Sequence, residues 1–308
     1  MIAFDHVGKR YRALIGRDVR ALEDFTLELH AGEVFGLAGP NGAGKTTLIA
    51  LLLGFLGPSE GTVRIAGLEP RRYVEAHGIG YLSELVSMPP MWRTEEALRR
   101  YAQLTGVPAG RVRARVSEVI EWMGLGEHRR KRVKQLSKGN LQRLGLAQSL
   151  LCEEHVVVLD EPTHGLDPVW TQRFRDVVDA LRRDDRVILI ASHNLDELSR
   201  LADRVGIIDR GRLQRIVDVR SGAERTEGEA TSYRVTLARG AELVAIVFPG
   251  ARPMGRGEFA LEGLTLQAVN AGLAELLARG ALVRAVYPAH TLLEQQFREV
   301  VAASGGDA

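Results

Sequence analysis

Cysteine is almost absent from this sequence, which has a single one, Cys152, among its 308 residues. One thiol cannot build an internal disulfide framework, so no disulfide partner is expected, and the count fits a reducing cytosol. Cys152 lies beside a very apolar segment. We therefore expect it to be an inert part of the core.

An excess of charge of one sign is also missing. The 41 Lys and Arg residues nearly balance the 39 Asp and Glu residues, which leaves a formal net charge of +2. Proteins that bind polyanions usually show a strong basic excess. The composition therefore gives no reason to expect nucleic acid as a partner.

Long hydrophobic runs are lacking as well. The longest apolar stretch, Leu48 to Leu56, is interrupted by Gly54 and is too short to span a bilayer. The residues after Met1 do not form a signal peptide. We expect a soluble chain of about two domains that reaches a membrane only through a partner.

A glycine-rich loop dominates what the sequence does contain. The apolar run Val34–Ala38 precedes it, and the helix-forming segment Thr47–Leu53 follows it. A strand, a glycine loop and a helix in this order are the context of a phosphate-binding loop. The loop consists of Gly39, Pro40, Asn41, Gly42, Ala43, Gly44, Lys45 and Thr46.

Each part of this loop has a chemical reason. Glycine lets backbone N–H groups converge on phosphate oxygens, and the following helix points its positive dipole end at them. We expect Lys45 to reach the β- and γ-phosphates of a nucleotide and the Thr46 hydroxyl to ligate magnesium. Thr47 belongs to the same predicted nucleotide site.

Short strands are predicted before the loop. Ile2–Phe4, the alternating apolar residues from Leu22 to Leu29, and Val34-Phe35 indicate an antiparallel patch. Tyr11 lies between the first two of these segments. It could stack on a purine, although a half-buried strand tyrosine is the simpler interpretation from spacing alone.

A mostly helical insert is predicted after the strand Gly78–Leu82, which ends at Ser83-Glu84. Apolar residues at helical spacing run through residues 85–150. The basic stretch His128–Lys134 is most simply a solvated face. Contact with a partner or with lipid headgroups is the alternative.

A capped helix closes this insert. Ser137 is a good N-cap, and Asn140 stands at the third helical position, a weak version of a capping box. Gly139 lies in the first turn of this helix. The first turn is therefore another place where bare amides could meet an anion.

Polar residues follow two buried strands. The apolar run Val156–Leu159 ends in Asp160 and Glu161, and the run from Val187 ends in Ser192 and His193. In open α/β sheets, ligands sit at the carboxyl ends of strands. We expect Asp160 to serve magnesium, Glu161 to act as a general base on water, and His193 to contact the γ-phosphate.

Taken together, the order of these motifs resembles the ATPase subunit of an ABC transporter over residues 1 to about 220. By this resemblance Gly39–Thr46 is the Walker A motif, Val156–Asp160 the Walker B motif and Glu161 the catalytic base. Leu136–Asn140 is the signature, Gly165–Asp167 the D-loop with Asp167, His193 the switch histidine and Tyr11 the aromatic residue that stacks on adenine.

The resemblance also implies a fold and an assembly. The fold is an α/β P-loop NTPase with an antiparallel β-subdomain and a helical insert at about 85–150. The chain acts as a homodimer with polytopic membrane permease subunits, at the cytoplasmic face of the cell membrane. Each ATP, with Mg²⁺, lies between the Walker A motif of one copy and Ser137, Lys138, Gly139 and Asn140 of the other.

The sequence departs from the family pattern at three positions. In the signature, Lys138 replaces the first glycine and Asn140 replaces the glutamine. Glu84 stands where a glutamine usually senses magnesium and the membrane partner. A carboxylate can ligate magnesium but adds negative charge near the γ-phosphate, so we expect Glu84 to be a metal ligand in an active site.

The tail is predicted to be a separate small domain. Residues 221–232 read as a polar linker, and residues 233–308 as an α+β accessory domain. Tyr233–Leu237, Leu243–Phe248 and Leu282–Tyr287 are predicted strands. Leu266–Ala278 is a predicted helix, and Thr291 is predicted to open a final one. The domain resembles the C-terminal extension of stand-alone exporter ATPases, which implies dimer support or regulation.

An exporter ATPase is therefore the leading hypothesis. The rival is a soluble ABC-type ATPase that acts on DNA or ribosomes. The single ATPase domain and the short insert argue against it, because such relatives carry long coiled coils or two ATPase domains. A scaffold that does not hydrolyse ATP is the third hypothesis.

Overall fold

The computed structural model describes residues 1–12, 18–220, 231–289 and 292–305. The chain divides into two compact units, the first formed by Met1–Val217 with Val300–Ala308 and the second by Asp218–Glu299. Most of the predicted linker, residues 221–230, lies outside the described residues. In the part of the chain that is described, no helix combines the length and the apolar character that a membrane crossing needs.

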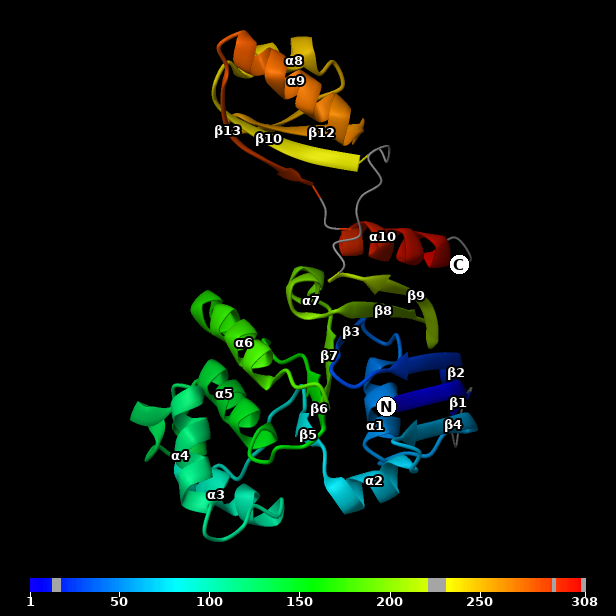
Figure 1. The fold of residues 1–308 in the computed structure, drawn as a ribbon, viewed down its shortest axis with the longest axis vertical. Coiled ribbons are helices and arrows are strands. Elements are labelled where there is room, and N and C mark those ends of the chain that lie inside the picture. The colour runs from blue at the N-terminus through cyan, green and yellow to red at the C-terminus, as the bar shows by residue number, and fades with distance from the viewer. Residues whose placement is uncertain (13–17, 221–230, 290–291, 306–308) are drawn as a thin grey trace. The chain divides into compact units, whose positions relative to one another are not determined.

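A six-stranded sheet forms the centre of the first unit (Figure 1). All of its strand pairs from β5 to β8 are parallel, and β9 follows β8 as a hairpin around Arg210, as predicted. In sheet order the strands are β5 (Gly80–Leu82), β6 (Val156–Asp160), β7 (Val187–Ser192), β3 (Val34–Ala38), β8 (Arg204–Asp209) and β9 (Arg212–Asp218).

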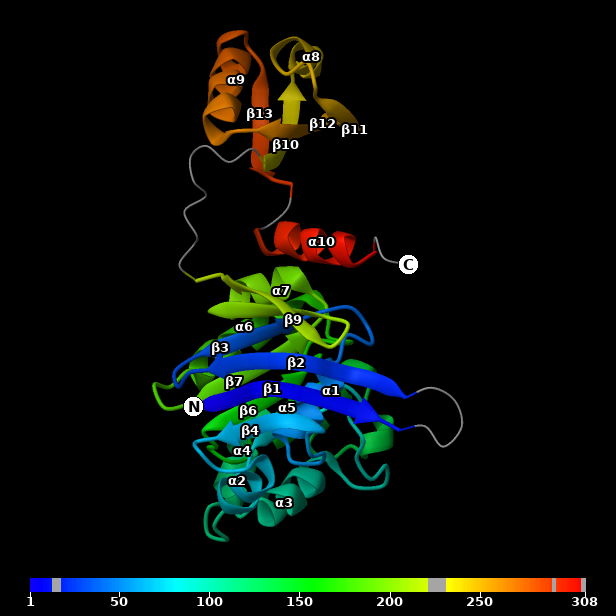
Figure 2. The same ribbon diagram turned by 90° about the vertical axis from the view of Figure 1, so that its right-hand side faces the viewer.

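A second sheet is antiparallel and lies along one side of the same unit (Figure 2). Its order is β2 (Val19–Leu29), β1 (Ile2–Tyr11) and β4 (Glu60–Ile65). The prediction of an antiparallel patch is confirmed for its first two segments, but it is wrong for Val34-Phe35. These two residues open β3, whose five residues are all buried as a central parallel strand requires.

Helix α1 (Lys45–Leu52) joins the two sheets. Its apolar side chains belong to one core cluster with residues of β1, β2 and β4 on one side and of β3, β6 and β7 on the other. The helix begins at Lys45, directly after the glycine loop. The core therefore fixes the position of the loop against both sheets.

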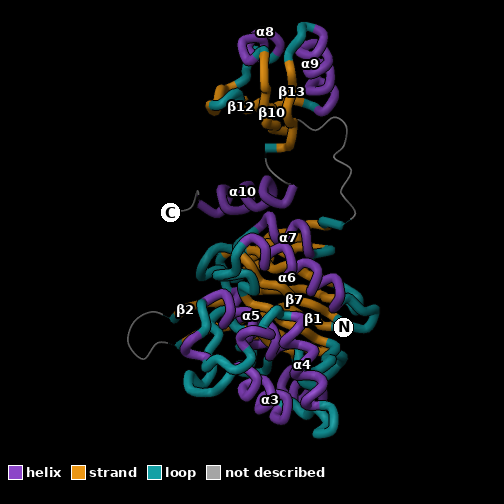
Figure 3. Tube along the Cα trace, turned by 90° about the vertical axis from the view of Figure 1, so that its left-hand side faces the viewer, coloured by secondary structure: helices purple, strands orange, loops and turns teal. Residues whose placement is uncertain are grey.

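The helical insert is confirmed. Helices α3 (Thr94–Leu104), α4 (Val112–Trp122) and α5 (Lys138–Ser149) pack on one another, on the side of the central sheet away from β1 and β2 (Figures 1 and 3). The first unit also contains the helices α2 (Pro70–His77), η1 (Gly126–His128), η2 (Val133–Gln135), α6 (Pro168–Leu181) and α7 (Leu195–Leu201).

The second unit is built on a four-stranded antiparallel sheet. Its order is β11 (Arg252–Gly255), β12 (Glu258–Leu264), β10 (Thr231–Arg239) and β13 (Leu282–Pro288). The predicted strands at 233–237 and 282–287 are confirmed, and so is the helix α9 (Leu266–Ala278). Strands β11 and β12 were not predicted, because few of their residues are buried.

The predicted strand Leu243–Phe248 is wrong. This segment forms η3 (Ala241–Leu243) and α8 (Val244–Val247). Val244 and Phe248 are buried while Ile246 is 58% exposed, which is the spacing of a helix turn and not of a strand. The last helix, α10 (Leu292–Gly305), is present, but its predicted capping residue Thr291 lies outside the described residues.

Candidate functional site

Three neighbouring parallel strands end at one edge of the central sheet. Strand β3 pairs Ala38 with Ser192 of β7, and β6 pairs Asp160 with Ala191. The glycine loop, Glu161 and His193 therefore leave the sheet side by side. The strand order brings together residues that are more than a hundred positions apart in the chain.

The glycine loop is held tightly at both ends. Gly44 has φ +113°, a backbone conformation that favours glycine, and a Cβ there would lie 2.7 Å from the carbonyl oxygen of Ala21. A Cβ at Gly39 would lie 2.4 Å from the carbonyl oxygen of Ile208. Packing against β2 and β8 therefore explains both glycines, independently of any ligand.

Lys45 is folded back onto its own loop. Its Nζ donates to the carbonyl oxygen of Gly39 at 2.6 Å and to that of Pro40 at 3.2 Å. Burial lowers the pKa of Lys45, whereas the nearby Glu161, Asp160 and Glu84 raise it. The ammonium group thus sits among acceptors at the strand edge, where a phosphate would compete for it.

Tyr11 lies beside the start of α1. Its ring is exposed, and its Oη is 3.4 Å from Oγ1 of Thr47, while Nζ of Lys9 lies 5.7 Å from the ring centre. The structure thus brings Tyr11 and Thr47 together, as a shared nucleotide site requires. Thr46, next to Thr47, is exposed at the same turn.

Asp160 is a buried carboxyl group at the end of β6. Burial raises its pKa to about 6, and the carboxylates of Glu84 and Glu161 add to the rise while Lys45 opposes it. Three carboxyl groups and one ammonium group therefore influence one another electrostatically at this strand edge. A concentration of negative charge of this kind favours a divalent cation.

Glu161 has a strained backbone and a carboxylate that accepts three hydrogen bonds. Its φ is +47°, and its N–H donates to the carbonyl oxygen of Ala191 at 2.8 Å. Oε1 accepts hydrogen bonds from the backbone N–H of His193 at 3.0 Å and from its Nδ1 at 2.9 Å, and Oε2 accepts one from Oγ of Ser192 at 3.2 Å. Strain in a non-glycine residue often marks a functional site.

His193 was predicted to face a γ-phosphate, and here its ring faces Glu161. The side chain of His193 is 63% exposed, whereas that of Glu161 is 9% exposed. The imidazole can therefore leave the carboxylate without any rearrangement of the core. The pair places both predicted catalytic groups within hydrogen-bond distance of each other.

The predicted signature helix is α5, and its cap is confirmed. Oγ of Ser137 accepts a hydrogen bond from the backbone N–H of Asn140 at 3.2 Å. The Asn140 amide itself donates from Nδ2 to Nε2 of His128 at 3.0 Å and accepts from Arg143. Asn140 is thus engaged within its own chain.

The predicted D-loop residue also caps a helix. Oδ1 of Asp167 accepts a hydrogen bond from the backbone N–H of Trp170 at 2.9 Å, at the start of α6. Among the hydrogen bonds of the described residues, none joins residues 137–140 or Asp167 to the glycine loop of the same chain. Within one copy, the described hydrogen bonds therefore do not join the predicted signature and D-loop residues to the glycine loop.

Two side chains that hold Glu161 in place were not predicted from the sequence. Nε2 of Gln142, which is buried, donates to the backbone carbonyl oxygens of Glu161 and Pro162 at 3.2 and 3.1 Å. Ser192, also buried, donates to the carboxylate. Gln142 lies four residues after Lys138 on α5, so helical spacing could have indicated that it shares a face with the signature.

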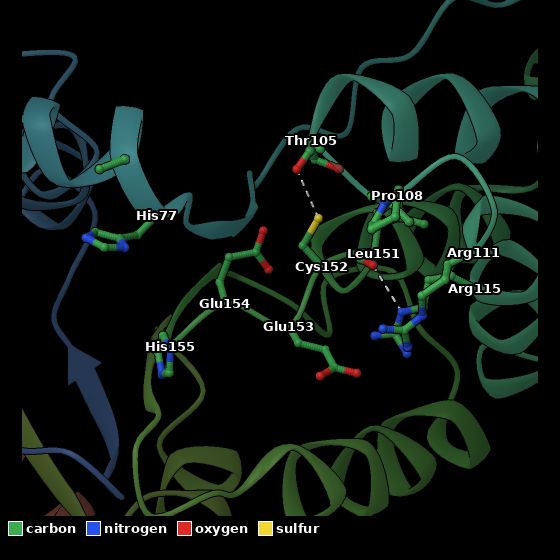
Figure 4. Close-up of a pocket in the computed structure, with 13 residues that line it drawn as sticks. His77, Thr105, Pro108, Arg111, Arg115, Leu151, Cys152, Glu153, Glu154 and His155 are labelled. Carbon is green, nitrogen blue, oxygen red and sulfur yellow. Dashed lines mark hydrogen bonds between the residues drawn. The ribbon is translucent and has the colours of Figure 1, made fainter.

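The prediction that Cys152 is part of the core is wrong. It is half-buried in the wall of a cavity of about 430 Å³, where its Sγ donates to the carbonyl oxygen of Thr105 at 3.3 Å (Figure 4). Burial raises the pKa of the thiol, which keeps it protonated. The cavity is lined by none of the residues that were predicted to bind ATP.

Comparison with known proteins identifies the family. Residues 22–164 match the family model described as ABC transporter. The uncharacterized ABC transporter ATP-binding protein YhcH of Bacillus subtilis is 32% identical over 228 residues, which are 73% of each chain. This chain belongs to the ATP-binding proteins of ABC transporters.

Other relatives of the family carry more specific names. The daunorubicin resistance ATP-binding protein DrrA3 of Streptomyces coeruleorubidus is 36% identical, over 69% of this chain and 66% of its own. The Nod factor export ATP-binding protein I of Paraburkholderia xenovorans is 34% identical, over 68% of each. The subunit is thus an ATP-binding ATPase, and the predicted family and activity are confirmed.

Solved structures confirm the predicted fold. The dimeric post-hydrolysis structure of the ATP-binding cassette MJ0796, bound to ADP and Pi, superposes with a TM-score of 0.66 at 20% identity. It covers 71% of this chain and 99% of the cassette. An ATP-binding subunit of an ABC transporter has a TM-score of 0.64 at 25% identity, over 71% of this chain and 90% of its own.

Proposed function

We propose that this ATPase drives export, as two copies that share two ATP molecules and move paired membrane permease subunits. The observation that carries the proposal is the strand edge where Lys45, Asp160, Glu161 and His193 meet. Relatives named for daunorubicin resistance and Nod factor export support export, and a dimeric structural neighbour supports the pairing. The proposed location is the cytoplasmic face of the cell membrane, through the permease.

In this proposal the glycine loop and Tyr11 hold the nucleotide. The backbone N–H groups of residues 39–47 and the N-terminus of α1 surround the phosphates, while Tyr11 stacks on the adenine. Lys45 leaves the carbonyl oxygens of Gly39 and Pro40 for the β- and γ-phosphates. That exchange replaces neutral acceptors with anionic ones, so it favours ATP binding.

Thr46, Asp160 and Glu84 are the proposed ligands of Mg²⁺. Hydroxyl and carboxylate oxygens suit this ion, which usually binds one or two carboxylates together with substrate phosphates. The described residues contain no group of three His, Cys, Asp or Glu side chains arranged to hold a metal alone. The bound ion would neutralise charge between the phosphates and the carboxylates of Asp160, Glu84 and Glu161.

Glu161 is the proposed general base. It polarises a water molecule for attack on the γ-phosphate, and this requires that the His193 imidazole release Oε1. The released imidazole can then turn toward the γ-phosphate. There it stabilises the charge that develops, together with Lys45 of the same copy and Ser137 of the second copy.

Substitution of the base tests this assignment. In Glu161→Gln we expect ATP binding to remain while hydrolysis falls by about 10³-fold, with a stable ATP-bound dimer detected by sedimentation. Glu153→Gln is a matched control, because Glu153 is exposed and lies away from the strand edge. Hydrolysis by Glu161→Gln at the parent rate would show that Glu161 is not the base.

The rival function is a soluble ATPase acting on DNA or ribosomes. Purification of the tagged full chain in detergent discriminates the two. We expect a polytopic membrane protein to accompany it, because relatives of the chain are named as ABC transporter and export ATP-binding proteins. Ribosomes or DNA in the eluate in place of a membrane protein would refute the export proposal.

We propose residues 1–220 as the ATPase domain, 221–232 as a linker and 233–308 as an accessory domain that supports the dimer or regulates it. The separate core cluster of the second unit supports an accessory role, because it packs around its own sheet and α9.

A further inference from the structure

Lys138 contacts the turn that follows the proposed base. Its Nζ lies 2.6 Å from Nε2 of His164, and its side-chain carbons lie over Gly165, where a Cβ would come within 3.1 Å of them. A Cβ on Gly139 would likewise lie 3.0 Å from the carbonyl oxygen of Gly165. The first turn of α5 therefore packs directly on residues 164–165.

The direction of this hydrogen bond follows from chemistry. A lysine ammonium group only donates, so Nε2 of His164 is the acceptor, in the tautomer that carries its proton on Nδ1. Two of the three ammonium protons of Lys138 remain for another acceptor. Both side chains are exposed, so that acceptor can approach from outside the chain.

His164 is itself anchored to the base segment. Its backbone N–H donates to the carbonyl oxygen of Glu161 at 3.1 Å, and Thr163 next to it donates from Oγ1 to Oε2 of Glu197 at 2.5 Å. Gln142 adds a second link, from α5 to the carbonyl oxygens of Glu161 and Pro162. The backbone that carries the imidazole is thus anchored by hydrogen bonds, whereas the lysine stem is long and flexible.

We propose that His164 is a positioning residue that holds the Lys138 ammonium group toward the γ-phosphate of an ATP bound by the second copy. The inference rests on the proposed function, which places α5 against the partner's nucleotide. Lys138 then supplies a charge where a signature glycine supplies only its backbone. His164 reduces the conformational entropy that Lys138 loses when the phosphate arrives.

A double-mutant cycle in the full chain tests the proposal. Every variant also carries Glu161→Gln, and the readout is the ATP concentration that gives half-maximal dimer in sedimentation. We expect Lys138→Met to raise this concentration about tenfold and His164→Ala about threefold. In the Lys138→Met background, His164→Ala should change nothing further.

Two further variants separate positioning from structure. His164→Gln presents a carbonyl oxygen in a similar place and should restore most of the loss. Lys134→Met removes an exposed lysine of η2 and should leave the ATP concentration unchanged, which controls for net charge.

Additive effects of the two substitutions would overturn the proposal, and so would a His164→Gln variant no better than His164→Ala. Failure of the Glu161→Gln parent to dimerise at any ATP concentration is a distinct result. It would refute the proposed function and this inference with it.

Discussion

The two units of this chain bury polar groups very differently. Among the described residues, every buried polar or charged side chain belongs to the first unit, including Lys45, Asp160 and Glu161 at the strand edge. The second unit has a core of apolar and aromatic side chains such as Tyr233, Val235 and Leu237. Burial of charge costs free energy unless it is compensated, so it concentrates where it serves chemistry.

The sheets show the same contrast. In β6 and β7 all residues are buried, because the parallel sheet is covered on both faces. In β10 only alternate residues are buried, as in an antiparallel sheet covered on one face. The first unit therefore has a strand edge where loops meet in a partly desolvated site, whereas the antiparallel sheet of the second unit is covered on one face.

The largest effect is expected from removing the ammonium group of Lys45 in the glycine loop. Lys45→Ala should lower the kcat/KM of ATP hydrolysis by about 10²–10³-fold, because a preorganised cation no longer meets the charge on the transferred phosphate. Lys134→Ala, which removes an exposed lysine of the helical insert, should change the rate by less than about twofold. An equally large loss in both variants would contradict the assignment.

Matched core truncations test whether the units are energetically separate. Leu189 in β7 and Leu276 in α9 are both fully buried. Each change to alanine should cost about 2–5 kcal/mol in the unit that contains it. Calorimetry should therefore show Leu276→Ala lowering one transition while ATP hydrolysis at low temperature stays within about twofold of the parent.

Leu189→Ala should instead lower both the other transition and the activity. A single transition that responds equally to both substitutions would show that the two units unfold as one.

Asp160 gives a pH-dependent prediction. Its pKa is raised from 3.8 to about 6 by burial, so the folded state favours the protonated acid. The contribution of Asp160 to the free energy of unfolding is therefore fully present below about pH 3.8 and is lost as the pH rises through about 6. Without nucleotide or metal, Asp160→Asn should therefore stabilise the protein by on the order of 2–3 kcal/mol at pH 8.

The gain should shrink as the pH falls from 6 toward 4. Chemical denaturation at several pH values measures it, with the exposed Asp176→Asn as the control. A gain that does not depend on pH would mean that the buried charge is not its source.

The smallest expected effects come from helix caps in the two units. Thr265 caps α9 through Oγ1 and the backbone N–H of Ala268, and Asp167 caps α6 through Trp170. Substitution by alanine should cost about 1 kcal/mol in either case. Only Asp167→Ala should also slow hydrolysis, while Thr265→Ser should keep both stability and rate.

Local patterns predicted most of the strand edge that is proposed to be catalytic. The glycine loop, the two acids after β6 and the histidine after β7 are each visible within a few residues, and parallel pairing brings them together. The contact between Lys138 and His164 could not be predicted in this way. It joins positions 26 residues apart, and neither position has a pattern that indicates the other.

The errors have physical causes. The apolar run 243–248 fits a buried strand or a single helix turn, and the choice depends on packing around Val244 and Phe248. Strand β11 is exposed at every position, so no hydrophobic pattern marks it. The contacts of Asn140 with His128 and Arg143 were not predicted, because these residues meet it only in the folded insert.

The central claim is that each ATP site is shared between two copies, and complementation tests it most directly. Ser137→Asp keeps a capping carboxylate on α5 but sets a negative charge against the partner's phosphate. It should be inactive alone, as should Lys45→Ala. A mixed dimer of the two variants, however, contains one intact site.

Equal mixing of the two full-length variants should therefore restore up to about a quarter of the parent ATP hydrolysis, because half of the randomly paired dimers are mixed and each has one of two sites. A rate no higher than the sum of the separate variants would contradict the shared site.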